Sequence, residues 1–246
     1  MLHNGGNTSV KINEKNIFGE EEEILYVKGS GRNLATINTV DFTPLRLSHM
    51  KKLMELMDIS DTMLVREQQL AMTHPEAPRP SVESLLHAII PFSWIDHTHA
   101  DAVVTLTNTP KGKKLIKNIY GDSFLIIPYV MPGFKLARTV YEITKKVDWQ
   151  QYEGMILLNH GIISFGTEAH ESYKRMINAV TLAEKYLKKF SSMPKNNFKK
   201  TAPVLKQETL RKLARIRKKV SIIRGSASLA RLNNSPEAQF FPVCRM

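Results

Sequence analysis

Trp94-Ile-Asp-His-Thr-His-Ala-Asp-Ala-Val-Val-Thr-Leu-Thr107 places two histidines, His97 and His99, in a stretch rich in Val, Ile and Thr. This composition predicts a β-strand that runs to about Asn108. Because residues i and i+2 of a strand face the same side, both imidazoles can point at one object. Imidazole is the commonest metal ligand in proteins. The stretch therefore predicts two ligands of a metal site; the alternative is two polar side chains on a half-solvated strand.

The composition is that of a globular protein with a buried core: 246 residues, 42% of them hydrophobic and 24% charged. The one cysteine, Cys244, excludes an intrachain disulfide framework and a cysteine metal cluster. The sequence shows no apolar run long enough to cross a bilayer and no N-terminal signal. We therefore expect a cytoplasmic protein with no membrane partner.

The net charge of +12 is concentrated at one end of the chain. Residues 193–246 contain 13 of the 35 Lys and Arg residues and 2 of the 23 Asp and Glu residues, so residues 1–192 are nearly neutral. We expect a folded domain over 1–192 and a basic helical tail over 193–246, with its helix near 206–224. The tail fits a nucleic-acid or membrane surface, but a solvated helix face explains it equally well, and we do not expect nucleic acid as a partner.

Hydrophobic periodicity predicts strands and helices that do not alternate strictly, unlike a doubly wound parallel sheet. The predicted strands lie near 9–12, 24–27, 94–107, 124–127, 154–158 and 162–165. The predicted helices of the domain lie near 44–57, 60–72, 82–90, 111–120, 134–146 and 167–190.

A third histidine, His160, follows the buried strand near 154–158. Together with His97 and His99 it would give the three-ligand open site typical of catalytic Zn²⁺. Glu83, in the first turn of a predicted helix, would add a carboxylate; the alternative is simple complementarity with the helix dipole. Two Gly- and Ser-containing loops, at 3–9 and 28–31, have backbone N–H groups suited to an oxyanion such as phosphate, although turn chemistry alone explains either loop.

The order of these segments resembles the class II aldolase/adducin domain family over residues 3 to about 190. The residues that carry the resemblance are Gly6-Asn-Thr-Ser9, Lys28-Gly-Ser-Gly31, Pro80-Ser-Val-Glu83 with His87, Asp96-His-Thr-His-Ala100, Pro128-Tyr129, and Asn159-His-Gly161 with Gly166. The detailed match is closest to the aldolase half of bifunctional rhamnulose-1-phosphate aldolase/alcohol dehydrogenase proteins. The stretches that indicate this subgroup are Asn4–Lys11, Leu25–Gly31, Ser84–Ala88 and Pro128–Phe134.

The resemblance implies a three-layer α/β/α fold with a mostly antiparallel central sheet, and a homotetramer with active sites at subunit interfaces. It implies the following roles: metal ligands His97, His99 and His160; catalytic residues Glu83 and Tyr129; substrate phosphate-binding residues Asn7, Ser30, Gly31 and Ser81, with Thr8 and Lys28 as weaker candidates. The implied cofactor is Zn²⁺ or another divalent metal, and Glu83 is either a proton carrier with a raised pKa or a fourth ligand.

The implied activity is cleavage of a ketose 1-phosphate, such as rhamnulose or fuculose 1-phosphate, to dihydroxyacetone phosphate and an aldehyde. The metal would act as a Lewis acid on a three-carbon enediolate. Val82 replaces a second serine found in some members. No dehydrogenase segment follows the tail, so we expect no NAD, and a separately encoded dehydrogenase is a candidate partner.

Two other readings stay open at this point. One is an epimerase or dehydratase on the same scaffold, which the motifs do not distinguish from an aldolase. The other is an inactive remnant or a non-catalytic interaction module, which retention of all three histidines disfavours.

Overall fold

The computed structural model describes residues 5–190 and 207–225. The chain divides into two compact units, Met1–Ser191 and Ser192–Met246. In the second unit the described element is helix α8 (Gln207–Arg224), where the sequence predicts a basic helix. Cys244, Asn4 and the expected boundary between 192 and 193 lie outside the described residues. None of the helices in the described ranges combines the length and apolar character needed to cross a bilayer.

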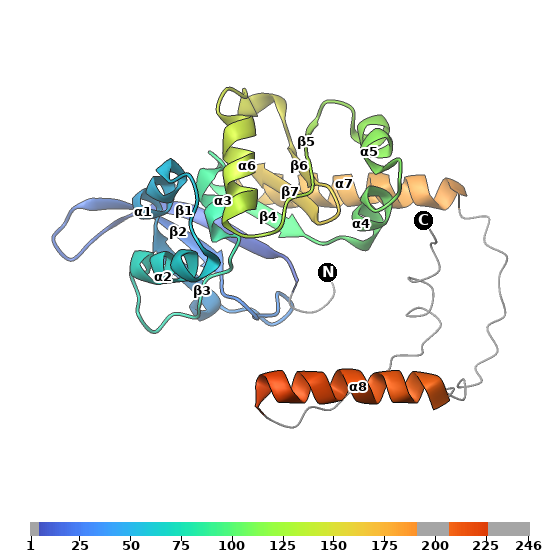
Figure 1. Ribbon diagram of the computed structural model, residues 1–246. Coiled ribbons are helices and arrows are strands. Elements are labelled where there is room, and N and C mark those ends of the chain that lie inside the picture. Colours follow the sequence, from blue (N-terminus) through green and yellow to red (C-terminus); the bar gives the residue numbers. More distant parts are fainter. Residues whose placement is uncertain (1–4, 191–206, 226–246) are drawn as a thin grey trace. The chain divides into compact units, whose positions relative to one another are not determined.

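A seven-stranded sheet forms the centre of the first unit, with the strand order β3-β2-β1-β4-β7-β6-β5 (Figure 1). Every pair of neighbouring strands is antiparallel except β5 and β6, which are parallel. The mostly antiparallel sheet expected from the sequence is therefore confirmed. The strands are β1 (Asn7–Lys15), β2 (Glu21–Lys28), β3 (Phe42–Arg46), β4 (Trp94–Thr98), β5 (Phe124–Ile127), β6 (Gly154–Leu157) and β7 (Gly161–Gly166).

Helices cover both faces of this sheet, so the three-layer fold is also confirmed (Figure 1). Neighbouring residues of β6 show the two layers, because successive side chains of a strand point to opposite faces. Met155 packs in a cluster with Leu86 and Leu136, whereas Ile156 packs in another with Ile116 and Met176. On the first face lie α1 (Leu47–Lys52), α2 (Asp61–Ala71), α3 (Ser84–Ile89) and α6 (Phe134–Thr144); on the second lie α4 (Asp101–Thr107), α5 (Gly112–Tyr120) and α7 (Ala169–Phe190). Short 3-10 helices occupy Thr39–Asp41, Leu53–Glu55 and Trp149–Gln151.

The strand predicted to run from Trp94 to about Asn108 is shorter than expected. It ends at Thr98, and α4 follows over Asp101–Thr107. Val103 and Leu106 are three residues apart and lie buried together against the second-face core. Their burial in a helix outweighs the β-propensity of the Val-Val-Thr run, because propensity is weak compared with tertiary packing.

The prediction of a helix that begins at Pro44 is also wrong, because Pro44 lies inside β3 and α1 begins only at Leu47. β3 is an edge strand of the sheet, where a residue without an N–H group is tolerated. Leu45 pairs with Leu25 of β2 and is fully buried. The helical spacing of the apolar residues predicts a helix from Pro44. Pairing with β2 instead places the first residues of that stretch, up to Arg46, in a strand.

Candidate metal centre

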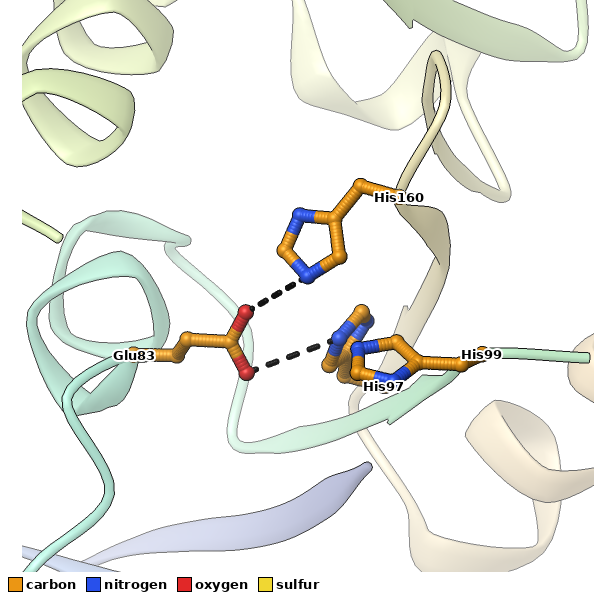
Figure 2. A group of neighbouring side chains, drawn as sticks. All are labelled: Glu83, His97, His99 and His160. Atoms are coloured by element: carbon orange, nitrogen blue, oxygen red, sulfur yellow. Dashed lines mark ion pairs between the residues drawn. The ribbon is translucent and has the colours of Figure 1, made fainter. Parts of the chain in front are cut away.

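Four side chains from three segments of the chain meet at the end of β4 (Figure 2). They are Glu83, His97, His99 and His160, and one ligand atom of each lies within 4.8 Å of all the others. His97 belongs to β4 and His99 follows its last residue, so the predicted i, i+2 arrangement does bring both rings together. His160 lies in the turn between β6 and β7, and Glu83 is the N-cap residue of α3.

His97 is held in one orientation by the neighbouring strand. Its Nδ1 lies 3.0 Å from the carbonyl oxygen of Ile162, which can only accept a hydrogen bond, so Nδ1 carries the proton. The buried Nε2 then has its lone pair free, and within the described residues it has no hydrogen-bond partner. Burial lowers the pKa of His97 to about 4, with smaller contributions from His160 and His99 and an opposing one from Glu83. The ring is therefore neutral at pH 7, the form that binds metals.

Glu83 faces two of the histidines and one amide. Its Oε1 lies 2.9 Å from Nε2 of His160, and its Oε2 lies 3.5 Å from Nε2 of His97 and accepts a hydrogen bond of 2.7 Å from Nδ2 of Asn7. Burial raises the pKa of this carboxyl, but His97, His160 and the Asn7 hydrogen bond together lower it well below its usual range. The prediction of a raised pKa from apolar walls is therefore wrong: the carboxylate lies beside two imidazoles and the amide donor of Asn7 rather than against apolar walls.

The turn that carries His160 depends on its two neighbours. Asn159 adopts a left-handed backbone conformation with φ of 59°, and its side-chain amide donates to Oδ1 of Asn108 at 2.7 Å. Gly161 has no room for a side chain, because a Cβ there would lie 2.4 Å from the carbonyl oxygen of Thr98 and 3.0 Å from the His97 ring. The glycine thus allows the β6–β7 turn to approach the end of β4 closely enough to bring His160 to His97.

This group of side chains fits a divalent metal ion. Three imidazoles and one carboxylate are a donor set that Zn²⁺ and related ions accept. Within the described residues, the buried Nε2 of His97 lacks a hydrogen-bond partner, as a ligand nitrogen does before its ion binds. His99 is exposed and completes the open side, with a pKa lowered by burial of part of its ring and by His160. The three predicted metal ligands and Glu83 are brought together as one group.

Two of the predicted phosphate-binding residues border this group. Asn7 of β1 pairs with His97 of β4, and its Nδ2 also lies 3.2 Å from Oγ of Ser81. Ser81 in turn accepts a hydrogen bond from the backbone N–H of Glu83. Thr8 follows Asn7 along the strand and so points to the opposite face of the sheet. The structure therefore separates Asn7 from Thr8.

The other two, Ser30 and Gly31, lie in an exposed loop beside the same segment. Gly29 forms a β-bridge with Pro80, and the N–H of Ser30 donates to the carbonyl of Arg79 at 2.8 Å. Lys28 is buried beneath this loop, and its Nζ donates to the carbonyl of Arg32 at 2.7 Å. Lys28 thus supports the loop from inside, while the Ser30 hydroxyl and the Gly31 backbone face outward.

Tyr129 is not brought to the metal group. It follows β5, is 54% exposed, and its hydroxyl contacts the sulfur of Met131 at 3.9 Å. Within the described residues no hydrogen bond joins it to Glu83 or to the three histidines. The catalytic role expected of this tyrosine therefore stays a prediction.

A buried Ser9–His87 pair beside the site has no role in the sequence-based prediction. Ser9 Oγ lies 2.7 Å from Nδ1 of His87, and both residues are buried. Three alternate polar residues of β1 contact α3 or a residue next to it. Asn7 contacts Glu83, Ser9 contacts His87, and Lys11 contacts the carbonyl of Ile90. The signal for this row was the polar i, i+2 spacing of Asn7, Ser9 and Lys11 at the start of the strand.

The solved structures that this chain is similar to share its first unit. The N-terminal class II aldolase domain of a conserved protein from Thermoplasma acidophilum is 38% identical and matches with a TM-score of 0.69, over 75% of this chain and 84% of that one. The sugar-phosphate aldolase from Thermotoga maritima is 16% identical, with a TM-score of 0.56 over 78% of this chain and 88% of that one. An L-fuculose 1-phosphate aldolase, also 16% identical, gives a TM-score of 0.50 over 89% and 88%. The last two likenesses concern the fold alone.

Among curated proteins, the chain is similar to the uncharacterized oxidoreductase YuxG of Bacillus subtilis (strain 168), with 36% identity over 183 residues. That match includes 74% of this chain and 26% of the relative, so the chain spans about a quarter of the relative's length. The sequence profile of the Class II Aldolase and Adducin N-terminal domain matches residues 1–187. With a matching profile over most of its length and a matching fold, this chain belongs to the class II aldolase and adducin N-terminal domain family.

Proposed function

We propose that this chain is a metal-dependent sugar-phosphate aldolase that cleaves a ketose 1-phosphate, such as rhamnulose or fuculose 1-phosphate, to dihydroxyacetone phosphate and an aldehyde. The observation that carries the proposal is the convergence of three imidazoles and one carboxylate within 4.8 Å. Membership in the family supports the reaction class. The subgroup resemblance to rhamnulose-1-phosphate aldolase is part of this proposal, as is a cytoplasmic location.

His97, His99 and His160 would hold the metal, for which Zn²⁺ is our first choice. When bound, the ion supplies Lewis-acid stabilisation of the negative charge that develops on substrate oxygens as the carbon–carbon bond breaks. The chain contributes the geometry in advance, because the Ile162 carbonyl fixes the His97 ring and burial keeps it neutral.

Glu83 is placed to carry a proton. Cleavage leaves a carbanionic carbon that must be protonated to give dihydroxyacetone phosphate, so the site needs a group that can hold and release a proton there. Glu83 is the carboxylate at the centre of the group, and Asn7 holds its Oε2 at 2.7 Å. Because its pKa is lowered, Glu83 is ionised at neutral pH and ready to accept that proton in the reverse, condensing direction.

The phosphate group of the substrate would bind beside Glu83. Asn7 and Ser81 are already hydrogen-bonded to each other there, and the Gly29–Pro80 bridge fixes the Ser30–Gly31 loop next to them. Binding at this loop would hold the remote end of the substrate and orient the reacting carbons toward the metal.

Tyr129 would act in the site of a neighbouring subunit. Its exposure supports this arrangement. We therefore propose a homo-oligomer, a tetramer as the family resemblance implies, in which Tyr129 takes the proton of the substrate hydroxyl that becomes the aldehyde carbonyl. We also propose a dehydrogenase as a further partner, because a longer relative of this chain is named as an oxidoreductase.

The test combines metal analysis of the purified chain with cleavage assays on rhamnulose and fuculose 1-phosphates, in which dihydroxyacetone phosphate is measured by a coupled reduction. We expect about one divalent ion per chain and metal-dependent cleavage of at least one substrate. His99→Ala should lose both, whereas a matched control at the exposed His170 of α7 should lose neither.

Absence of bound metal in the native protein would contradict the site assignment. Bound metal without cleavage, but with epimerisation or water loss detected on pentulose or related phosphates, would overturn the aldolase in favour of the other chemistry on this scaffold.

A further inference from the structure

Lys11 is a lysine whose amine lies at the wall of a cavity, away from the metal group. The cavity has a volume of about 330 Å³ and is lined by Lys11, Glu23, Lys51, Phe92 and Ser93, among others. Lys51 and Glu23 form an ion pair of 3.1 Å, and each side chain is 52% exposed, so this side of the cavity is open to solvent.

The amine of Lys11 is fixed rather than free. Its Nζ donates to the carbonyl oxygen of Ile90, at the end of α3, and its backbone N–H donates to the carbonyl of Ser93 at 2.9 Å. No carboxylate is within ion-pair distance of it in the described residues, unlike Lys51. The Ile90 carbonyl therefore holds the nitrogen in place without neutralising a positive charge.

The charges around this amine favour its neutral form. Burial lowers the pKa of Lys11 to about 7, the cation of Lys51 on α1 lowers it further, and Glu23 on β2 opposes the shift. His87 on α3 is the third titratable group that faces it, and its own pKa is lowered to about 3, mainly by burial. A neutral amine has a free electron pair and can attack a carbonyl carbon, which an ammonium cannot.

We propose that Lys11 and this cavity form a second, carbonyl-binding site, which captures small aldehydes or oxo acids that carry an anionic group as a Schiff base. The neutral Lys11 nitrogen adds to the carbonyl carbon and gives up one proton, which the carbonyl oxygen takes to form a carbinolamine. The resulting hydroxyl leaves as water with the second proton of the amine, so that a carbon–nitrogen double bond remains with no change in oxidation state. Lys51, which keeps donors beyond its bond to Glu23, binds the anionic group of the ligand.

The test is reductive labelling of the full-length protein at pH 7 with glyoxylate and cyanoborohydride, followed by peptide mass analysis. At this pH about half of the Lys11 amines are neutral, compared with about one in three thousand for an ordinary lysine. We expect Lys11 to be labelled at least about tenfold faster than Lys15, an exposed lysine of the same strand. The ratio should be the same with and without EDTA, because the site does not use the metal.

A Lys51→Gln variant tests the anion pocket. It should slow glyoxylate labelling of Lys11 at least about threefold more than labelling by uncharged acetaldehyde, with Lys15 as the internal reference in each sample. Labelling of Lys11 no faster than of Lys15 would overturn the site itself. Equal slowing with both aldehydes would overturn the anion-binding role of Lys51.

Discussion

The metal group and the residues proposed to surround the substrate differ in their exposure to solvent. Glu83 and His160 have side chains only 10% exposed, and His97 is 1% exposed, so these three side chains are shielded from solvent within one chain. By contrast, the side chain of Tyr129 is 54% exposed and that of Val82 is 48% exposed. A single chain thus brings the candidate metal ligands together by itself, whereas the substrate contacts, as we propose, also involve exposed loops and a neighbouring subunit.

The largest expected effect comes from removing a buried ligand. His97→Ala should reduce bound metal from about one ion per chain to less than a tenth, and cleavage by at least about a thousandfold, because the Lewis acid is lost. Metal content and initial rates check this, with His170→Ala as the matched surface control. Full metal content in His97→Ala would contradict its place among the ligands.

Glu83→Gln should separate proton transfer from metal binding. The amide keeps the size of the side chain, so we expect at least half of the metal to be retained, while cleavage falls by about a hundredfold to ten-thousandfold. Rates measured at saturating metal test this. If activity were restored fully by excess metal, Glu83 would be only a ligand.

Gly161→Ala tests how tightly the two strand ends must approach. The added Cβ would meet the Thr98 carbonyl at 2.4 Å and the His97 ring, so the β6–β7 turn must move. We expect metal affinity to fall about tenfold to a hundredfold. Titration with a chelator measures the affinity, and thermal unfolding in EDTA shows whether the effect concerns the metal or the fold.

Tyr129→Phe tests the proposed role of this tyrosine in the site of a neighbouring subunit. We expect the turnover rate to fall about tenfold to a hundredfold with unchanged metal content. Mixing unfolded Tyr129→Phe and His97→Ala chains and refolding them together should restore part of the activity, because some sites then combine intact residues from two chains. A matched mixture of Glu83→Gln and His97→Ala should restore none, since those two residues meet within one chain. Equal outcomes for the two mixtures would contradict the shared site.

The last prediction concerns stability without metal and involves pH and the buried histidines. The pKa values of His87 and His97 fall to about 3 and 4 in the folded protein from 6.5, so the unfolded chain binds more protons between these values. Stability without metal should therefore be complete above pH 6.5 and decline on acidification toward pH 4, by about 1.4 kcal/mol per pH unit for each histidine. Chemical unfolding in EDTA measures the slope, and His87→Gln should reduce it. An unchanged slope would contradict the role of His87.

The site residues could be anticipated from sequence because they occupy short local patterns. His97 and His99 are two residues apart, and strand geometry gives both the same direction whatever surrounds them. The motif that contains Glu83 also precedes a helix, as predicted, although Ser81 stands before the N-cap residue rather than at it. The type of element could not be predicted where the apolar spacing fits both a helix and a strand, as at Pro44 and at Val103. At these positions the outcome depends on the pairing of β3 and on the packing of α4, which involve residues far away in the chain.

What the sequence by itself determined is therefore the chemistry: which side chains can bind a metal, which loop suits phosphate, and the family to which they belong. Only the tertiary structure decided which of these side chains meet. It placed Asn7 beside His97 through strand pairing, lowered rather than raised the pKa of Glu83, and left Tyr129 exposed. The physical reason is that ligand type is a property of one residue, whereas distance and electrostatics depend on residues far apart in the chain.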